Sequence, residues 1–140
     1  MLGSSLSDWA LPSVPAEGAQ SGVFIVPPVG SRVWIEFEGG DPDSPIWSGG
    51  FWANSSEVPV LATMPPPIPN GQNAVLRTSG RTTLVLSDAP PSPVAGGILL
   101  ESPGGATIRV NDLGVWISNG KGATIDLLGP TVLINGKPVG

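Results

Sequence analysis

Apolar and polar residues alternate with a period of two along much of the chain, and Gly, Pro, Asn and Asp separate the alternating segments. No window keeps the 3.6-residue period of an amphipathic helix over a useful length. We therefore predict an almost entirely β protein. Aromatic usage divides the chain into two parts, because seven of its eight Trp and Phe residues precede residue 53 and only Trp116 follows.

The first part contains three expected strands, at 22–26, 32–38 and 46–52. Strand 32–38 alternates cleanly, and the Gly39-Gly40-Asp41-Pro42 turn leads to the next strand, as in a hairpin of a small barrel. The candidates for the barrel core are Val33, Ile35, Phe37 and Trp47.

A Pro-rich segment separates the two parts. Pro65, Pro66, Pro67 and Pro69 fix φ and favour an extended, polyproline-like conformation over a helix or a paired strand. We expect a semi-rigid connector at 60–73, which leaves 1–59 as the first domain and 74–140 as the second.

The second part is a series of short alternating segments in which Ile recurs every eight to ten residues. Each segment would have one apolar face, and nothing else in the sequence remains to cover it. Other copies of the chain must therefore cover these faces and protect the strand edges. A closed homotrimeric β-helix fits this pattern, although the period does not set the number of copies. The candidates for the shared core are Ile98, Leu100, Ile108, Val110, Val115, Ile117, Ile125, Leu127, Val132 and Ile134.

Composition supports an assembly subunit and excludes several kinds of chemistry. Charged residues make up only 12% of the chain, against about a quarter in ordinary soluble domains. The sequence has no His and no Cys, which excludes Ser-His and Cys-His nucleophile pairs, the usual zinc sites and disulfides. The net charge of −5 opposes non-specific binding to nucleic acid. The first fifteen residues lack the basic and apolar regions of a signal peptide, so we expect none.

A long ordered pattern resembles a known family. It comprises LPSVP at 11–15, GVFIVPPVGSRVWIEFEGGDPDSPIWSGGFW at 22–52, the Pro connector and, more loosely, the Gly/Ile pattern that follows. These stretches resemble the central spike of contractile phage tails, also called baseplate assembly protein V. VgrG proteins of type VI secretion and extracellular contractile injection systems are its relatives. The resemblance implies an all-β chain with an N-terminal OB-fold-like barrel and a C-terminal trimeric β-helical needle. Members usually begin with a further strand before the stretch matching Leu6 to Pro15, so the barrel is expected to be open at that position.

The resemblance also implies a role and partners. The protein would be a structural homotrimeric rod, not an enzyme and without a cofactor. It would pierce a target envelope when the sheath contracts. A trimeric baseplate hub would bind the N-terminal barrel, and a separate PAAR-like tip protein would cap the C-terminus. The expected location is a phage tail baseplate or a secreted injection particle, assembled in the cytoplasm. Because His is absent, the iron-bearing tip of some phage spikes is not expected.

Three groups of residues allow other interpretations, and each has a simpler structural explanation. The carboxylates of the acidic cluster could bind Ca²⁺, or they could act as the acid and base of a carboxylate-dependent hydrolase. A solvated strand face and turn-capping Asp residues explain the same carboxylates without a metal. Ser118 and Lys121 could form a Ser-Lys pair, although SNGKG is typical of a tight turn. Aromatic side chains could form a stacking platform in a carbohydrate- or receptor-binding module, the main rival function, although core and interface packing is the simpler role. The acidic cluster is Glu36, Glu38, Asp41 and Asp43, and the aromatic set is Phe24, Trp34, Trp47, Phe51 and Trp52.

Trp116 is a large aromatic among Ile and Val. Because Val115 and Ile117 occupy the inner face, we predict that Trp116 lies on the outside or between chains.

Overall fold

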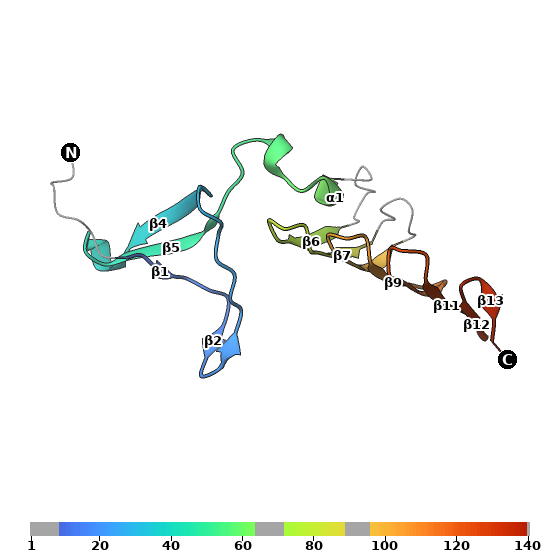
Figure 1. Ribbon diagram of the computed structural model, residues 1–140. Coiled ribbons are helices and arrows are strands. Elements are labelled where there is room, and N and C mark those ends of the chain that lie inside the picture. Colours follow the sequence, from blue (N-terminus) through green and yellow to red (C-terminus); the bar gives the residue numbers. More distant parts are fainter. Residues whose placement is uncertain (1–8, 64–71, 89–95, 140) are drawn as a thin grey trace. The chain divides into compact units, whose positions relative to one another are not determined.

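The computed structural model describes residues 9–63, 72–88 and 96–139 and is almost entirely β (Figure 1). The chain divides into two compact units, Met1–Ser55 and Ser56–Gly140. Within the described residues, helical structure is limited to α1 (Val60–Thr63) and the short 3-10 turns η1 (Glu38–Gly40) and η2 (Ser55–Glu57). The predicted all-β fold class is confirmed.

The N-terminal unit contains a three-stranded sheet and a separate two-stranded hairpin. The sheet consists of β1 (Leu11–Pro12), β4 (Val33–Phe37) and β5 (Pro45–Gly50) in the order β1-β5-β4. Strand β4 runs antiparallel to β5, which confirms the predicted hairpin, whereas β1 runs parallel to β5. Strands β2 (Glu17–Gly18) and β3 (Ser21–Gly22) form the small hairpin.

The prediction of a strand at 22–26 is wrong. Only Gly22 belongs to a strand, and its φ of 142° lies outside the range that most residues adopt. The Val23 N–H donates to the Ala16 carbonyl and closes the β2–β3 hairpin. Pro27 and Pro28 follow without N–H donors, so the chain leaves the hairpin without a strand partner.

The connector begins with a helical turn, where an extended segment was predicted. In α1 the Ala62 N–H donates to the Pro59 carbonyl at 2.8 Å, and the Thr63 hydroxyl donates to the Val60 carbonyl at 3.0 Å. Pro59 has no N–H and a fixed φ, which suit the residue just before a helix. The four proline residues on which the prediction depended, between 65 and 69, lie outside the described residues.

The C-terminal unit is an eight-stranded antiparallel meander, here called the ladder. Its strand order is β13-β12-β11-β10-β9-β8-β7-β6, so each strand pairs with its neighbours in sequence. Figure 1 shows the strands following one another from β6 to β13. Their bounds are β6 Asn73–Arg77, β7 Thr83–Ser87, β8 Gly97–Glu101, β9 Thr107–Asn111, β10 Gly114–Ser118, β11 Thr124–Leu128, β12 Thr131–Ile134 and β13 Lys137–Pro138.

The ladder has little core of its own. Among the described residues, Val85 is the buried large hydrophobic side chain, with 1% of its surface exposed. Its neighbours Thr83 and Ser87 are also buried, and the Ser87 hydroxyl donates to the Asn73 side-chain oxygen. One copy of the ladder is therefore a thin sheet that buries few apolar groups by itself.

Candidate functional site

One side of the ladder, here called the aliphatic face, carries two uninterrupted rows of apolar side chains. Antiparallel partners share a face, so the strand register places these residues side by side across the strands. The first row is Leu76, Leu84, Leu100, Ile108, Ile117, Ile125 and Ile134. The second row is Ala74, Leu86, Ile98, Val110, Val115, Leu127 and Val132. All ten residues proposed from sequence as the shared core lie in these two rows.

The aliphatic face is open to solvent in a single copy. Most of its side chains are exposed, from 37% for Val110 to 53% for Leu76, while Leu84 and Val115 are half-buried. Exposed apolar patches of this continuity mark interaction surfaces in soluble proteins. The aliphatic face is suited to burial against another apolar surface. Its two rows consist of Ala, Val, Leu and Ile, which supply no acid, base or nucleophile.

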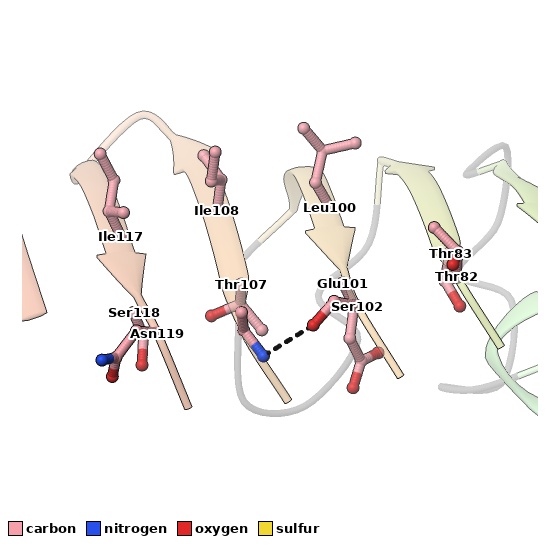
Figure 2. A pocket seen from close by; sticks show the side chains of 11 residues that line it. Thr82, Thr83, Leu100, Glu101, Ser102, Thr107, Ile108, Ile117, Ser118 and Asn119 are labelled. Carbon is pink, nitrogen blue, oxygen red and sulfur yellow. Dashed lines mark hydrogen bonds between the residues drawn. The ribbon is translucent and has the colours of Figure 1, made fainter. Parts of the chain in front are cut away.

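A trough of about 480 Å³ opens at one end of β8, β9 and β10. Figure 2 shows Leu100, Ile108 and Ile117 side by side, pointing the same way from three successive strands. Hydroxyl and amide side chains such as Ser118 and Asn119 line the opposite end. Glu101 is the ionisable group of the lining, so the trough brings together no acid–base pair.

Trp116 lies on the other side of the ladder, here called the mixed face, away from Val115 and Ile117. It is half-buried, and the Arg109 guanidinium carbon lies 6.0 Å from the centre of its ring. In the register, Arg109 and Asp126 are its neighbours on the two adjacent strands. The Arg109 Nε is buried and has no hydrogen-bond partner within the described chain. Arg109, Trp116 and Asp126 thus form one cross-strand row with opposite charges on either side of the indole.

Three five-residue loops on one long side of the ladder have the same geometry, which sequence reasoning missed. They span 78–82, 102–106 and 119–123. In each, the first backbone N–H donates to the fifth carbonyl, at 2.9–3.1 Å. The fifth N–H donates in turn to the first side chain, whose acceptor is a Thr78, Ser102 or Asn119 oxygen, at 3.0–3.2 Å. The fourth residue has a positive φ in all three loops, 72° at Arg81, 84° at Gly105 and 101° at Gly122.

Ser118 and Lys121 belong to this loop geometry. The Ser118 Oγ accepts a hydrogen bond from the Gly120 N–H at 3.1 Å, and the Asn119 Oδ1 accepts one from the Lys121 N–H at 2.8 Å. These contacts explain the SNGKG sequence as a structured turn.

In the N-terminal unit, three of the proposed barrel-core residues share a face. Ile35 is the register partner of Trp47, and Phe37 is the partner of Pro45. Ile35 and Phe37 remain 45% and 43% exposed, while Trp47 is half-buried. Val33 is half-buried and lies beyond a register shift in the same strand pair.

The aromatic set is only partly brought together. The rings of Trp34 and Phe51 lie 4.9 Å apart between centroids, with an interplanar angle of 37°. Trp34, Trp52 and Phe24 are exposed at 59%, 61% and 86%. The unit therefore presents an exposed aromatic pair on its surface.

The acidic residues have local structural roles. Glu36 accepts a hydrogen bond from the Ser48 hydroxyl at 2.7 Å, and Asp41 accepts one from the Asp43 N–H at 3.0 Å within its turn. Glu38 was expected on the same strand as Glu36, but the strand ends at Phe37 and Glu38 begins η1. Among residues 9–63, 72–88 and 96–139, no group of three or more acidic residues could hold a metal ion.

Comparison with known families agrees with these two units. Residues 1–52 match the type VI secretion system/phage-baseplate injector OB domain. Residues 73–139 match the phage baseplate V C-terminal trimerisation domain, which spans the ladder. The chain belongs to the phage baseplate V family. No curated protein matches the chain.

Membership of the phage baseplate V family gives each of the two units a role. The N-terminal unit is an OB domain, and the ladder is a trimerisation domain, so the chain self-associates as a homotrimer. The protein is a structural component of a phage tail or injection-machine baseplate. In the part of the chain that the structure describes, no helix is long and apolar enough to cross a membrane.

Proposed function

We propose that this baseplate V protein is the central spike of a contractile tail or injection machine, a homotrimeric rod that pierces the target envelope when the sheath contracts. The observation that carries the proposal is the pair of uninterrupted aliphatic rows on the ladder. Three ladders around a common axis would turn these exposed rows into one continuous core. Burial of apolar area would drive assembly, at about 25 cal/mol for each Å² removed from water.

The ten residues Ile98, Leu100, Ile108, Val110, Val115, Ile117, Ile125, Leu127, Val132 and Ile134 form the shared core in this proposal. Rigidity along the rod follows because close-packed interiors resist compression. The protein acts mechanically and not as an enzyme. Support comes from the structural family and from a trough whose lining holds a single ionisable residue, Glu101.

The N-terminal unit is proposed to dock on a trimeric hub of the baseplate. Its exposed Trp34, Phe51 and Trp52 supply apolar area for such a contact, and its three-stranded sheet leaves the outer side of β4 without a partner among the described strands. A separate PAAR-like tip protein is proposed at the other end, beyond β13. Assembly of the particle is proposed to take place in the cytoplasm.

The first experiment is the native mass of the full chain before and after heating. We expect a species of three times 14.2 kDa that survives heating which unfolds ordinary domains. A stable monomer would contradict the spike. In whole particles, Ile108→Asn should prevent spike assembly and killing of target cells. Thr107→Asn, one residue away on the mixed face, serves as the matched control and should leave both unchanged.

A carbohydrate- or receptor-binding module remains the alternative function, favoured by the exposed Trp34–Phe51 pair. It requires saturable binding of a glycan or receptor that Trp34→Ala abolishes. The spike requires a stable complex with the hub instead. Binding measured on the same trimer preparation distinguishes the two functions.

A further inference from the structure

The two long sides of the ladder differ in charge. Alternate strand ends fall on the same side, so the loops 78–82, 102–106 and 119–123 and the turn at 135–136 share one side, here called the loop side. The turns at 112–113 and 129–130 lie on the opposite side, here called the turn side, together with the end of β7. The loop side carries Arg77, Arg81, Lys121 and Lys137 with Glu101. The turn side carries Asp88 and Asp112, and its described residues include no Lys or Arg.

The turn side also presents an apolar side chain at its edge. Leu113 is 68% exposed at the tip of the β9–β10 turn, next to the exposed Asp112. The Asn111 Oδ1 accepts a hydrogen bond from the Leu113 N–H at 2.9 Å and fixes the turn. Leu113 is therefore held outward by an ordered turn.

On the loop side, two loops approach each other through glycine residues near the level of the Leu113 turn. The loop 102–106 joins β8 to β9, and the loop 119–123 joins β10 to β11. They therefore lie one strand spacing, about 4.8 Å, to either side of the level of the Leu113 turn, which joins β9 to β10. Gly120 lies so close to Gly105 that a Cβ there would come within 2.7 Å of the Gly105 carbonyl. The two loops therefore meet backbone to backbone at this glycine pair, here called the Gly105–Gly120 saddle, and Lys121 follows Gly120 in the sequence.

We propose that in the trimer the turn side of each ladder docks on the loop side of the next copy, with Leu113 over the Gly105–Gly120 saddle and Asp112 beside Lys121. This proposal rests on the homotrimeric spike of the proposed function and specifies how its copies meet. Threefold rotation makes every contact between neighbours heterologous, so one side of a sheet meets the opposite side of the next. The opposite charges of the two sides favour this contact and fix the relative height of the copies.

In the proposed trimer, a second pair of opposite charges would meet between neighbouring copies at the β6–β7 end of the ladder. Arg81 lies in the loop between β6 and β7, and Asp88 follows β7, so a cation and a carboxylate again face each other within about one strand spacing. The Asp88 carboxylate accepts a hydrogen bond from the Gln72 N–H at 3.1 Å, which holds it at this end of the ladder.

A cysteine pair tests the contact directly. The natural sequence has no Cys, so Leu113→Cys/Lys121→Cys introduces the only two thiols. Within one copy they are separated by a five-residue strand, about 17 Å, which is too far for a disulfide. After oxidation we expect a covalent trimer on a non-reducing denaturing gel, and monomers from Leu113→Cys or Lys121→Cys alone.

Two outcomes would overturn the proposal and leave the spike intact. One is a trimeric native mass with no cross-link in the double variant. The other is a single variant that cross-links as strongly as the double variant, because that would require like sides to meet. A monomeric native mass of the unaltered chain would instead overturn the proposed function and this proposal with it.

Charge reversal gives a second test that needs no disulfide geometry. Lys121→Glu alone and Asp112→Lys alone should each lower the melting temperature of the trimer, with a larger loss at low salt. Asp112→Lys/Lys121→Glu restores the opposite charges and should recover most of the loss. A double variant no more stable than the single variants would overturn the pairing.

Discussion

The two units both expose apolar side chains, but they do so in different ways. In the N-terminal unit the exposed residues are aromatic, come from short strands and loops, and meet mainly as the Trp34–Phe51 pair. In the ladder they are aliphatic, come from successive strands, and lie in two unbroken rows. Because the strands of the ladder keep a regular register, its partly exposed aliphatic side chains together form one continuous apolar surface. We infer that the ladder is the part built for repeated self-contact and the N-terminal unit the part built for a different partner.

The largest expected effect comes from the aliphatic rows. Ile117→Ala should destabilise the trimer by about 2–5 kcal/mol for each copy, because it leaves a cavity in the shared core. Ile35→Ala changes an apolar position of similar exposure in the N-terminal unit, 45% against 38% for Ile117, and is the matched control. It should leave ladder melting nearly unchanged. Thermal melting of the trimer measures both. If both variants lowered the melting temperature of the trimer equally, the assignment of self-contact to the ladder alone would be wrong.

The second prediction concerns how tightly the strands of the ladder pack. A Cβ on Gly114 would come within 2.2 Å of the Leu127 carbonyl oxygen, so Gly114→Ala should cost about 1–3 kcal/mol by overpacking. Gly104 has open space around its Cβ position, and Gly104→Ala is the control. Denaturant unfolding compares the two variants. A harmless Gly114→Ala would show that the sheet relaxes as easily as a loop.

The third prediction tests the N-terminal unit. Trp34→Ala removes the ring contact with Phe51 and should destabilise this unit by about 0.5–1.5 kcal/mol, while trimer melting stays the same. Binding to the purified hub should weaken in the same variant. Trp116→Phe, on the mixed face of the ladder, is the control for hub binding and should have no effect on it. If Trp34→Ala weakens trimer melting instead, the aromatic pair belongs to the self-contact.

The fourth prediction concerns the loop geometry. Arg81 has a φ of 72°, where the two equivalent positions have Gly, so Arg81→Gly should be about 1 kcal/mol more stable than Arg81→Ala. Both variants remove the charge, so their difference isolates the backbone strain. Unfolding of the two variants at the same salt concentration measures it. Equal stability would mean that the three loops are not equivalent in energy.

Much of the ladder could be predicted from sequence because burial on one face imposes a period of two. Ile108 and Val110, or Ile125 and Leu127, show this period directly, and the position of Trp116 on the opposite face follows from its neighbours. The three loops could not be predicted in the same way, because no position has the same residue in all three sequences, TSGRT, SPGGA and NGKGA. Their common signal is a side-chain acceptor at the first residue and a residue that tolerates a positive φ at the fourth, with Arg81 the exception.

The N-terminal unit was harder to predict because its apolar residues do not alternate. The run Val23 to Val26 is continuously apolar, which fits either a buried strand or an exposed contact segment, and the following Pro27 and Pro28 remove the donors that a strand needs. Ile35 and Trp47, two of the candidates for the barrel core, are register partners across β4 and β5. The charge difference between the two sides of the ladder depends on which strand ends fall together, and this becomes visible only once the order of the strands is known.

Because each strand of the ladder pairs with its neighbours in sequence, the length of the ladder depends on the number of hairpins it contains. Deletion of residues 102–118 removes β9 and β10 and joins Glu101 to Asn119, so the loop 119–123 takes the place of 102–106 with the same hydrogen bonds. Leu100 would then face Ile125 and Ile98 would face Leu127, and both rows would continue without a break. The shortened ladder would lose two strand spacings, about 10 Å. Evolution can therefore adjust the reach of such a chain in whole hairpins, by duplication or loss, without redesigning any of its contacts.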